Sequence, residues 1–251
     1  EEAIDENGNT TTTTVVDEGP NDDDKDDDDN EVIVDGDPPV IIEPPEPPDD
    51  PRKFYVTKGS VSIATHALQY GTGAFGGIRG YLDATEETIN IFRLKDHTAR
   101  MLNSAKLLRC NVPYDRDSLA DVITALVEKN APTTDVYIRP FIYKPALQLT
   151  PRLRGIGDEL TIYLLSLGDY LDLQRGQKAI VSSWFRVPDN VIPSRGKLSG
   201  SYVNSAFIKD EAEEKGGDEA IVLNTSGKVS EGSSCNLFIV RNGTLITPPV
   251  T

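Results

Sequence analysis

Residues 192–204 read IPSRGKLSGSYVN, and this stretch decides how the whole chain is interpreted. One lysine, Lys197, stands among glycine and serine residues, and Tyr202 follows it five positions later. A second short stretch, VSEG at 229–232, contributes one carboxylate, Glu231. A lysine amine can act as a nucleophile and a base, but an isolated lysine in a Gly/Ser loop is usually a surface residue. The roles of Lys197 and Glu231 therefore depend on the other motifs of the chain.

The first 52 residues differ sharply in charge from the rest of the chain. They hold 20 of the 41 acidic residues, and their cations are Lys25 and Arg52. The net charge of −16 therefore belongs to this segment, because residues 53–251 carry 21 acidic and 23 basic residues. We predict that residues 1–52 form an acidic, proline-rich, disordered leader, since they offer too little apolar surface to offset the entropy of ordering. Neither part has the basic footprint of a nucleic-acid-binding protein.

Metal sites, disulfides and membrane spans are not expected. The acidic run at 22–29 lacks the glycine and the closing glutamate of a calcium loop. Cys110 and Cys235 are too far apart in the sequence for a zinc motif or a disulfide framework. No signal peptide is recognisable, and no apolar run approaches the ~18–20 residues of a membrane span. We therefore expect a cytoplasmic protein with small-molecule partners, without a membrane or nucleic-acid partner.

The segments after residue 52 predict an α/β (α+β) fold. Apolar residues at helical spacing predict helices at 96–109 and 118–129, with Asp96 and Ser118 as N-caps, and a third helix at about 200–215. Pro140 is expected to interrupt a strand ladder. Runs of Val, Ile, Leu and Tyr predict strands at 78–82, 89–93, 135–143, 160–167 and 178–184, then a meander at 219–223, 228–230, 237–240 and 244–246.

A polar connection at 169–177 predicts a boundary between two domains. The first is a small α/β domain at 53–170. The second, at 177–251, contains one predicted helix and a few short strands, which offer little area for a complete core. We therefore expect residues 177–251 to be the first part of a larger domain.

The string GTGAFG at 71–76 fits the GxGxxG pattern of dinucleotide-binding proteins. That pattern must follow a strand and open a helix, so that pyrophosphate meets the helix N-terminus. Residues 78–82 continue instead as a predicted strand. We therefore interpret these glycines as a close-packed loop and expect no nicotinamide or flavin site.

Several motifs together resemble the class IV, or fold-type IV, aminotransferases, and most closely the branched-chain amino acid aminotransferases. They run in one order along the chain: THALQYG (65–71), FGGIR (75–79), YIRP (137–140), IPSRGKLSGSYVN (192–204), VSEG (229–232) and NLF (236–238). The resemblance implies a small sandwich domain, an incomplete pseudo-barrel domain from 177, and pyridoxal 5′-phosphate in the cleft between them. It implies a homodimer, because in that family a loop of the partner subunit, around Tyr70 here, completes the site.

The resemblance also assigns four residues to the cofactor. Lys197 is implied as the residue that holds the aldehyde and moves the proton. Glu231 is implied as the partner that keeps the pyridine nitrogen protonated, and Tyr202 as the donor to the phenolic oxygen. Arg100, on the predicted helix 96–109, matches the phosphate-binding arginine, whose planar fork suits phosphate better than an ammonium group does.

The substrate residues are implied in the same way, and the strand pattern supports two of them. Alternation with period 2 places Tyr137 and Arg139 on one face of the predicted strand 135–143. A pocket for both leucine-like chains and a glutamate carboxylate needs aromatic walls and one movable arginine. The resemblance adds four further contact residues, namely Tyr70, Phe75, Arg79 and Tyr170.

Some features depart from the family pattern and leave alternatives open. Gly76 and Cys235 stand where the family usually has glutamate, and the resemblance stops before the part of the fold that supplies a second phosphate-binding helix N-terminus. The implied reaction is transfer of the amino group from leucine, isoleucine or valine to 2-oxoglutarate. A D-amino acid transaminase, an R-selective amine transaminase, an aminodeoxychorismate lyase, or an inactive relative acting as a binding module are the alternatives.

Overall fold

The computed structural model describes residues 2–4, 10–12, 61–85, 87–166 and 175–249. Contacts divide the chain into two compact units, Glu1–Glu43 and Pro44–Thr251. In the first unit, β1 (Glu2–Ile4) and β2 (Thr10–Thr12) form an antiparallel pair. The rest of the predicted leader lies outside the described residues, as does Tyr170. The polar connection at 169–177 is described from residue 175 onward, so the predicted domain boundary stays a prediction.

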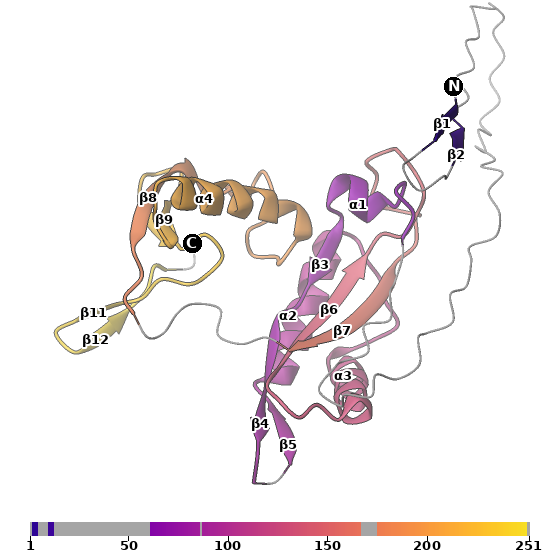
Figure 1. Cartoon of the computed structure of the whole chain (residues 1–251), viewed down its shortest axis with the longest axis horizontal. Helices are drawn as coiled ribbons and strands as arrows, with labels where there is room; N and C mark the ends of the chain where they lie inside the picture. Colours follow the sequence, from indigo (N-terminus) through magenta and orange to yellow (C-terminus); the bar gives the residue numbers. More distant parts are fainter. Residues whose placement is uncertain (1, 5–9, 13–60, 86, 167–174, 250–251) are drawn as a thin grey trace, which may run out of the picture. The chain divides into compact units, whose positions relative to one another are not determined.

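A five-stranded antiparallel sheet forms the first half of the second unit (Figure 1). Its central strand β6 pairs with β3 and β4 along one edge and with β7 along the other, while β5 extends the sheet beyond β4. A short helix, α1 (His66–Tyr70), precedes it. The five strands are β3 (Gly73–Phe75), β4 (Ile78–Asp83), β5 (Thr88–Ile91), β6 (Val136–Tyr143) and β7 (Glu159–Ser166).

The predicted interruption at Pro140 is found on one side of β6. Along that side, β4 pairs with β6 as far as Ile138, and β3 takes over at Phe141. On the other side the ladder continues, with Pro140 paired to Ile162 of β7. A proline lacks a backbone N–H, so it is tolerated where the neighbouring strand changes.

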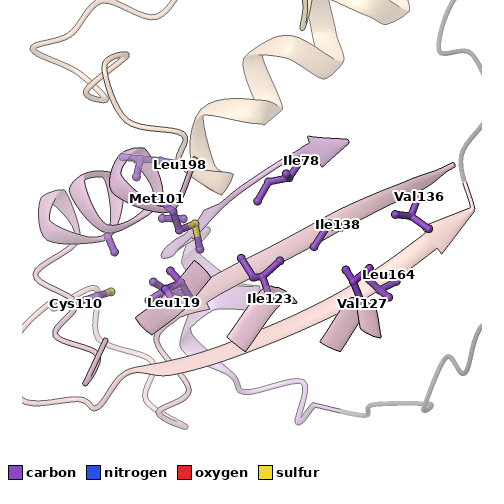
Figure 2. Packing of buried hydrophobic residues seen from close by; sticks show 13 residues of the cluster. Ile78, Met101, Cys110, Leu119, Ile123, Val127, Val136, Ile138, Leu164 and Leu198 are labelled. Atoms are coloured by element: carbon purple, nitrogen blue, oxygen red, sulfur yellow. The ribbon is translucent and has the colours of Figure 1, made fainter. Parts of the chain in front are cut away.

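Two helices, α2 (Leu94–Leu107) and α3 (Arg116–Asn130), pack against one face of this sheet. Alternate residues of β6 are buried beneath them, as period 2 requires. Figure 2 shows the packing, with Ile123 of α3 close to Ile138 of β6. We call this core the first cluster; its buried members are Ala74, Ile78, Met101, Ala105, Cys110, Leu119, Ile123, Val127, Val136, Ile138, Ile142, Leu164 and Leu198.

The second half of this unit begins at residue 175 in the described chain. Strand β8 (Ala179–Phe185) is parallel to β9 (Glu219–Leu223), and β10 (Val229–Glu231) pairs antiparallel with β9. The connection between the parallel strands carries the short helix η1 (Ser199–Ser201) and α4 (Tyr202–Glu214). The core here, which we call the second cluster, has four buried members, Ile208, Ala212, Ala220 and Val222.

The last two strands of the described chain, β11 (Ile239–Arg241) and β12 (Thr244–Ile246), form an antiparallel hairpin. Asn242 and Gly243 both have positive φ, which is the type I′ geometry that an Asn-Gly turn predicts. None of the helices in the described residues is both long enough and apolar enough to cross a lipid bilayer.

Both predicted helix caps were wrong. Asp115, rather than Ser118, caps α3: its carboxylate accepts from the Asp117 and Ser118 amides, while the Ser118 hydroxyl accepts from the Asp115 amide, a reciprocal capping box. Helix α2 likewise starts two residues before Asp96, after Arg93. The helix periodicity was correct, but the cap lies three residues earlier because Ser118 itself occupies the third helical position.

Candidate active site

The backbone around Lys197 is attached to the first cluster. Leu198 is buried in that cluster and forms an isolated antiparallel bridge with Ala74 of β3. The Phe75 amide donates to the Lys197 carbonyl at 3.1 Å, and the Lys197 amide donates to the Ser104 hydroxyl of α2 at 3.1 Å. The lysine is therefore fixed by a strand and a helix that lie far from it in the sequence.

Two glycines permit this close approach. The Gly200 amide donates to the Gly71 carbonyl at 3.1 Å. Gly71 has φ of +64°, and a Cβ atom added to it would lie 2.7 Å from the Gly200 Cα atom. Any larger residue at position 71 would therefore be strained in its backbone and would push the loop that carries Lys197 away.

The Lys197 side chain points to Tyr202 and lies against aromatic rings. Its Nζ donates to the Tyr202 Oη atom at 2.6 Å. It also lies 5.0 Å from the Phe75 ring centroid and 5.2 Å from that of Tyr202, within the range of a cation–π contact. The two rings are tilted against each other at 4.7 Å, so Phe75 and Tyr202 form one wall around the amine.

Arg139 and Tyr137 lie next to this wall, on the same face of β6 as predicted. Arg139 Nη2 donates to the Tyr137 hydroxyl at 2.8 Å, and its Cζ atom lies 4.3 Å from the Phe75 ring centroid. The Arg139 Nε atom is buried without a hydrogen-bond partner among the described residues. A buried donor of this kind is costly unless something accepts from it, so Arg139 is suited to an added acceptor such as a carboxylate.

Arg100 projects from α2 near His97. Its Nη2 atom lies 3.1 Å from the His97 Nδ1 atom, so a neutral imidazole accepts from the guanidinium. Burial lowers the pKa of His97, and the charges of Arg100 and Lys197 lower it further, although Asp96 opposes them. The imidazole therefore stays neutral near pH 7 and leaves Arg100 as the cation.

A cavity of 280 Å³ lies between Lys197, Arg100 and Glu231. Its lining includes Arg100, Lys197, Tyr202 and Glu231, which are the four residues predicted to hold the cofactor, together with Arg186 and Ser233. Glu231 Oε1 lies 2.7 Å from Arg186 Nε. This N–H does not meet hydrogen-bond geometry, so the contact is one of charge rather than a hydrogen bond.

The donor set fits pyridoxal 5′-phosphate. An amine, a phenol, a carboxylate and a guanidinium suit an aldehyde, a phenolic oxygen, a protonated pyridine nitrogen and a phosphate, respectively. The Ser233 hydroxyl is buried beside them and has no hydrogen-bond partner in the described chain, which leaves one more donor for a bound molecule. The described residues contain no group of three or more His, Cys, Asp or Glu side chains that could hold a metal ion.

None of the five predicted substrate residues in the described chain is among the residues that line this cavity. Phe75, Tyr137 and Arg139 lie beside the Lys197 amine, whereas Tyr70 and Arg79 lie further from it. The hydroxyl of Tyr70, at the end of α1, donates to the Leu149 carbonyl. Arg79 lies opposite Tyr137 across the β4–β6 pair, and its Cζ is 5.8 Å from the Tyr81 ring centroid. Arg79 is thus a neighbour of the Tyr137 face, whereas Tyr70 is not in contact with Lys197.

Sequence reasoning missed Ser104 and Arg186. Ser104 comes one helical turn after Arg100 and donates to its carbonyl at 2.9 Å, so helical spacing from Arg100 was the available signal. Arg186 directly follows the apolar strand β8, but its partners lie 18 to 47 residues further along the chain. Nothing in the local pattern identifies such partners.

The two departures from the family pattern have local explanations. A Cβ atom at Gly76 would lie 2.8 Å from the Cγ atom of Pro140, so a glycine suits this position. The Cys235 thiol donates to the Glu219 carboxylate at 3.7 Å. Burial raises the pKa of Cys235, with the Glu219 charge as the next cause, so the thiol stays protonated and serves as a neutral donor.

Known proteins match this chain over about three quarters of its length. The family model of the class IV amino-transferases matches residues 82–251. The probable branched-chain-amino-acid aminotransferase of Aquifex aeolicus is 45% identical over 193 residues, which are 77% of this chain and 62% of that protein.

Solved structures are similar to it as well, among them the following two. The branched-chain aminotransferase of Thermoproteus uzoniensis, solved with norvaline, has a TM-score of 0.72 and 41% identity, and the match covers 76% of this chain and 64% of that one. The branched-chain amino acid aminotransferase of Thermobaculum terrenum, solved in its PLP-form, has a TM-score of 0.71 and 34% identity, covering 76% and 62%. The chain thus spans less than two thirds of the length of these relatives. Because the family model covers more than half of it, the chain belongs to the class IV amino-transferase family.

Proposed function

We propose that this chain carries a pyridoxal-phosphate-dependent transfer of the amino group from leucine, isoleucine or valine to 2-oxoglutarate. One observation supports this proposal above the others. The Lys197 amine lies 2.6 Å from the Tyr202 hydroxyl in a cavity that Glu231 and Arg100 also line. The names and the identities of the similar proteins favour branched-chain amino acids as the substrates.

The proposal gives each of these residues one task. Bound pyridoxal phosphate supplies an aldehyde that accepts the amino group and an electron-poor ring that stabilises negative charge at the substrate Cα. Lys197 holds the aldehyde carbon and then moves a proton at the substrate Cα. Glu231 holds the proton of the ring nitrogen, Tyr202 donates to the phenolic oxygen, and Arg100 binds the phosphate.

The substrate side rests on Arg139, Tyr137 and Phe75. Arg139 has a buried, unpartnered Nε–H and is held by the Tyr137 hydroxyl and the Phe75 ring. In the proposal this guanidinium binds the substrate carboxylate, and Phe75 forms the apolar wall for a branched side chain. Arg79 and Tyr170 complete the proposed set of substrate residues.

A cytoplasmic homodimer is part of the proposal. Tyr70 belongs to the proposed substrate set, but its hydroxyl binds the Leu149 carbonyl. Tyr70 is 36% exposed in its own chain, so it is accessible to a second subunit. This supports a role for Tyr70 in the site of a partner subunit, and analytical ultracentrifugation tests the dimer directly.

The test of the cofactor site is chemical labelling. The chain is incubated with pyridoxal phosphate, reduced with borohydride, digested and mapped by mass spectrometry. We expect the label on Lys197 and its loss in Lys197→Ala. Lys228→Ala, which removes an exposed lysine, serves as the matched control and should keep the label. Labelling spread over several surface lysines, or its persistence in Lys197→Ala, would contradict the proposal.

A substrate panel separates the reactions that share this site. L-leucine, D-alanine and a simple primary amine are each offered with 2-oxoglutarate, and glutamate formation is measured. We expect turnover with L-leucine at least about tenfold above the other two. The simple amine lacks the carboxylate that Arg139 would bind, and D-alanine has the opposite configuration at Cα and no branched side chain for the apolar wall. Preference for D-alanine or the simple amine would favour the other transaminases, and labelling without turnover would favour a binding module.

A further inference from the structure

Arg186 lines the cavity that Lys197 and Glu231 also line. It follows the last residue of β8, and its side chain is 14% exposed. A guanidinium has five N–H donors in a rigid plane, so a largely buried one must find several acceptors at fixed directions. The hydrogen bonds and the ion pair of Arg186 therefore show which parts of the chain it holds in place.

The two terminal nitrogens of Arg186 bind two different segments. Nη1 donates to the Asn204 Oδ1 atom at 3.2 Å and to the Ser205 hydroxyl at 3.1 Å, both on α4. Nη2 donates to the carbonyls of Gly232 and Ser233, each at 2.8 Å, directly after β10. One side chain thus joins the helix that begins at Tyr202 to the segment that follows Glu231.

The third nitrogen faces Glu231 itself. Nε lies 2.7 Å from Glu231 Oε1, and a carboxylate keeps acceptor capacity on its second oxygen after such a contact. Arg186 thus contacts Glu231 and also the two residues after it. The carboxylate and its backbone are fixed by the same group.

Asn204 fixes the arginine in turn. Its Nδ2 donates to the Phe185 carbonyl at 3.1 Å, and its Oδ1 also accepts from the Val187 amide at 3.3 Å. The backbone on both sides of Arg186 is thereby bound to α4. The spacing between Tyr202, at the start of that helix, and Glu231 is set through Arg186 and Asn204.

We propose that Arg186 is a positioning residue that holds Glu231 at a fixed distance from Lys197 and Tyr202. The inference rests on the proposed function, in which Glu231 and Lys197 would both hold the same cofactor. It needs the fork of an arginine, because a lysine ammonium is a single charged point that cannot bind α4 and the 231–233 segment together. No step of the reaction passes through Arg186.

A double-mutant cycle tests this role in the 251-residue chain. Arg186→Met, Glu231→Gln and the double variant are compared with the unchanged chain. We expect Arg186→Met to lower kcat about tenfold with a KM for L-leucine changed less than about threefold. If Arg186 acts through Glu231, adding Arg186→Met to Glu231→Gln lowers kcat by less than about twofold more, since coupled neighbours are not additive. Two effects that multiply in full would overturn the inference.

Cofactor binding gives a readout that does not depend on turnover. The dissociation constant for pyridoxal phosphate is measured by absorbance titration, and we expect Arg186→Met to raise it about tenfold. The matched control is Arg175→Met, which removes an arginine that binds Asp218 through both terminal nitrogens. It should leave the dissociation constant within about twofold.

Arg186→Lys covers the case in which Arg186→Met fails to fold. It keeps the charge, so we expect its melting temperature to stay close to that of the unchanged chain while kcat remains reduced. Full kcat in Arg186→Lys would overturn the need for a fork. If the unchanged chain fails to bind pyridoxal phosphate, both the proposed function and this inference are overturned. If it binds pyridoxal phosphate but the effects of Arg186→Met and Glu231→Gln on kcat are independent, this inference alone is overturned.

Discussion

The two hydrophobic clusters differ in the kind of interaction that maintains them. The first cluster packs two helices against a five-stranded sheet and buries thirteen residues. The second cluster buries four, while Trp184 and Phe207 stack on each other with about half of their surfaces exposed.

Around the second cluster, hydrogen bonds of buried polar groups contribute a larger share of the contacts than they do around the first. Glu211 and Glu219 are buried and hydrogen-bonded, and Arg186 joins three segments. The comparison shows that the proposed site combines an apolar framework, which fixes Lys197, with a polar one, which fixes Glu231.

Truncating a core isoleucine in each cluster should produce the largest difference. Ile138 and Ile208 are both fully buried. We expect Ile138→Ala to lower the free energy of unfolding by about 4 kcal/mol and Ile208→Ala by about 2 kcal/mol, because fewer packed neighbours surround the second site. Urea unfolding followed by circular dichroism measures both. Equal losses would show that the second cluster is packed as well as the first.

Acid should destabilise the polar region through Glu211. Hydrogen bonds from Lys215, Ser182 and Ser183 lower the pKa of Glu211 to about 2. Its contribution to stability is therefore complete above pH 4.5 and is lost as the pH falls toward 2. We expect Glu211→Gln to be less stable at pH 7 and to approach the unchanged chain near pH 2. Emission from Trp184, the single tryptophan, follows this region during the titration. A stability difference independent of pH would contradict the assignment.

Ser104 connects Lys197 to α2, and its removal should have a moderate effect. Ser104→Ala leaves the Lys197 amide without its acceptor, and we expect a loss of about 1–2 kcal/mol and weaker binding of pyridoxal phosphate. Thr124→Ala is the matched control, because Thr124 also donates to a carbonyl one turn earlier, at 3.0 Å, on the neighbouring helix. It should cost less than about 0.5 kcal/mol. Equal effects of the two variants would show that the contact to Lys197 contributes nothing.

The exposed aromatic pair should matter least for stability. Trp184 and Phe207 have ring centroids 5.0 Å apart and are nearly parallel. We expect Phe207→Ser to change the free energy of unfolding by under about 1 kcal/mol, because both rings already meet solvent. Thermal unfolding measures this, and the near-ultraviolet circular dichroism of Trp184 should lose intensity. A loss of several kcal/mol would mean that this face contributes to the core.

The sequence predicted the periodic elements well and the connections between them poorly. Helix α3 and strands β6 and β7 were predicted within about two residues, because their apolar spacing is set by their own geometry. Strand β3 was interpreted as a loop, since a glycine-rich stretch has no side-chain alternation to read. Its glycine at 73 is needed because an added Cβ would lie 2.3 Å from the Phe141 ring, a contact across strands that no local pattern reveals.

The candidate site shows the same division. Lys197, Tyr202 and Glu231 were identified through motifs and Arg100 through its place on a predicted helix in the family resemblance, and all four line one cavity. Ser104 and Arg186 were missed because their importance lies in contacts made across long sequence separations. A side chain that binds three separate segments carries no sequence signal until the chain has folded.

The burial of Leu198 in the first cluster attaches Lys197 to one core, whereas Glu231 pairs with Val222 of the other. If the region around the second cluster opens transiently, Lys197 stays anchored by its adjoining leucine, while Glu231 departs with the opened part. Under the proposed function, Lys197 would still take up pyridoxal phosphate on warming after transfer of the amino group had stopped, so labelling should outlast turnover.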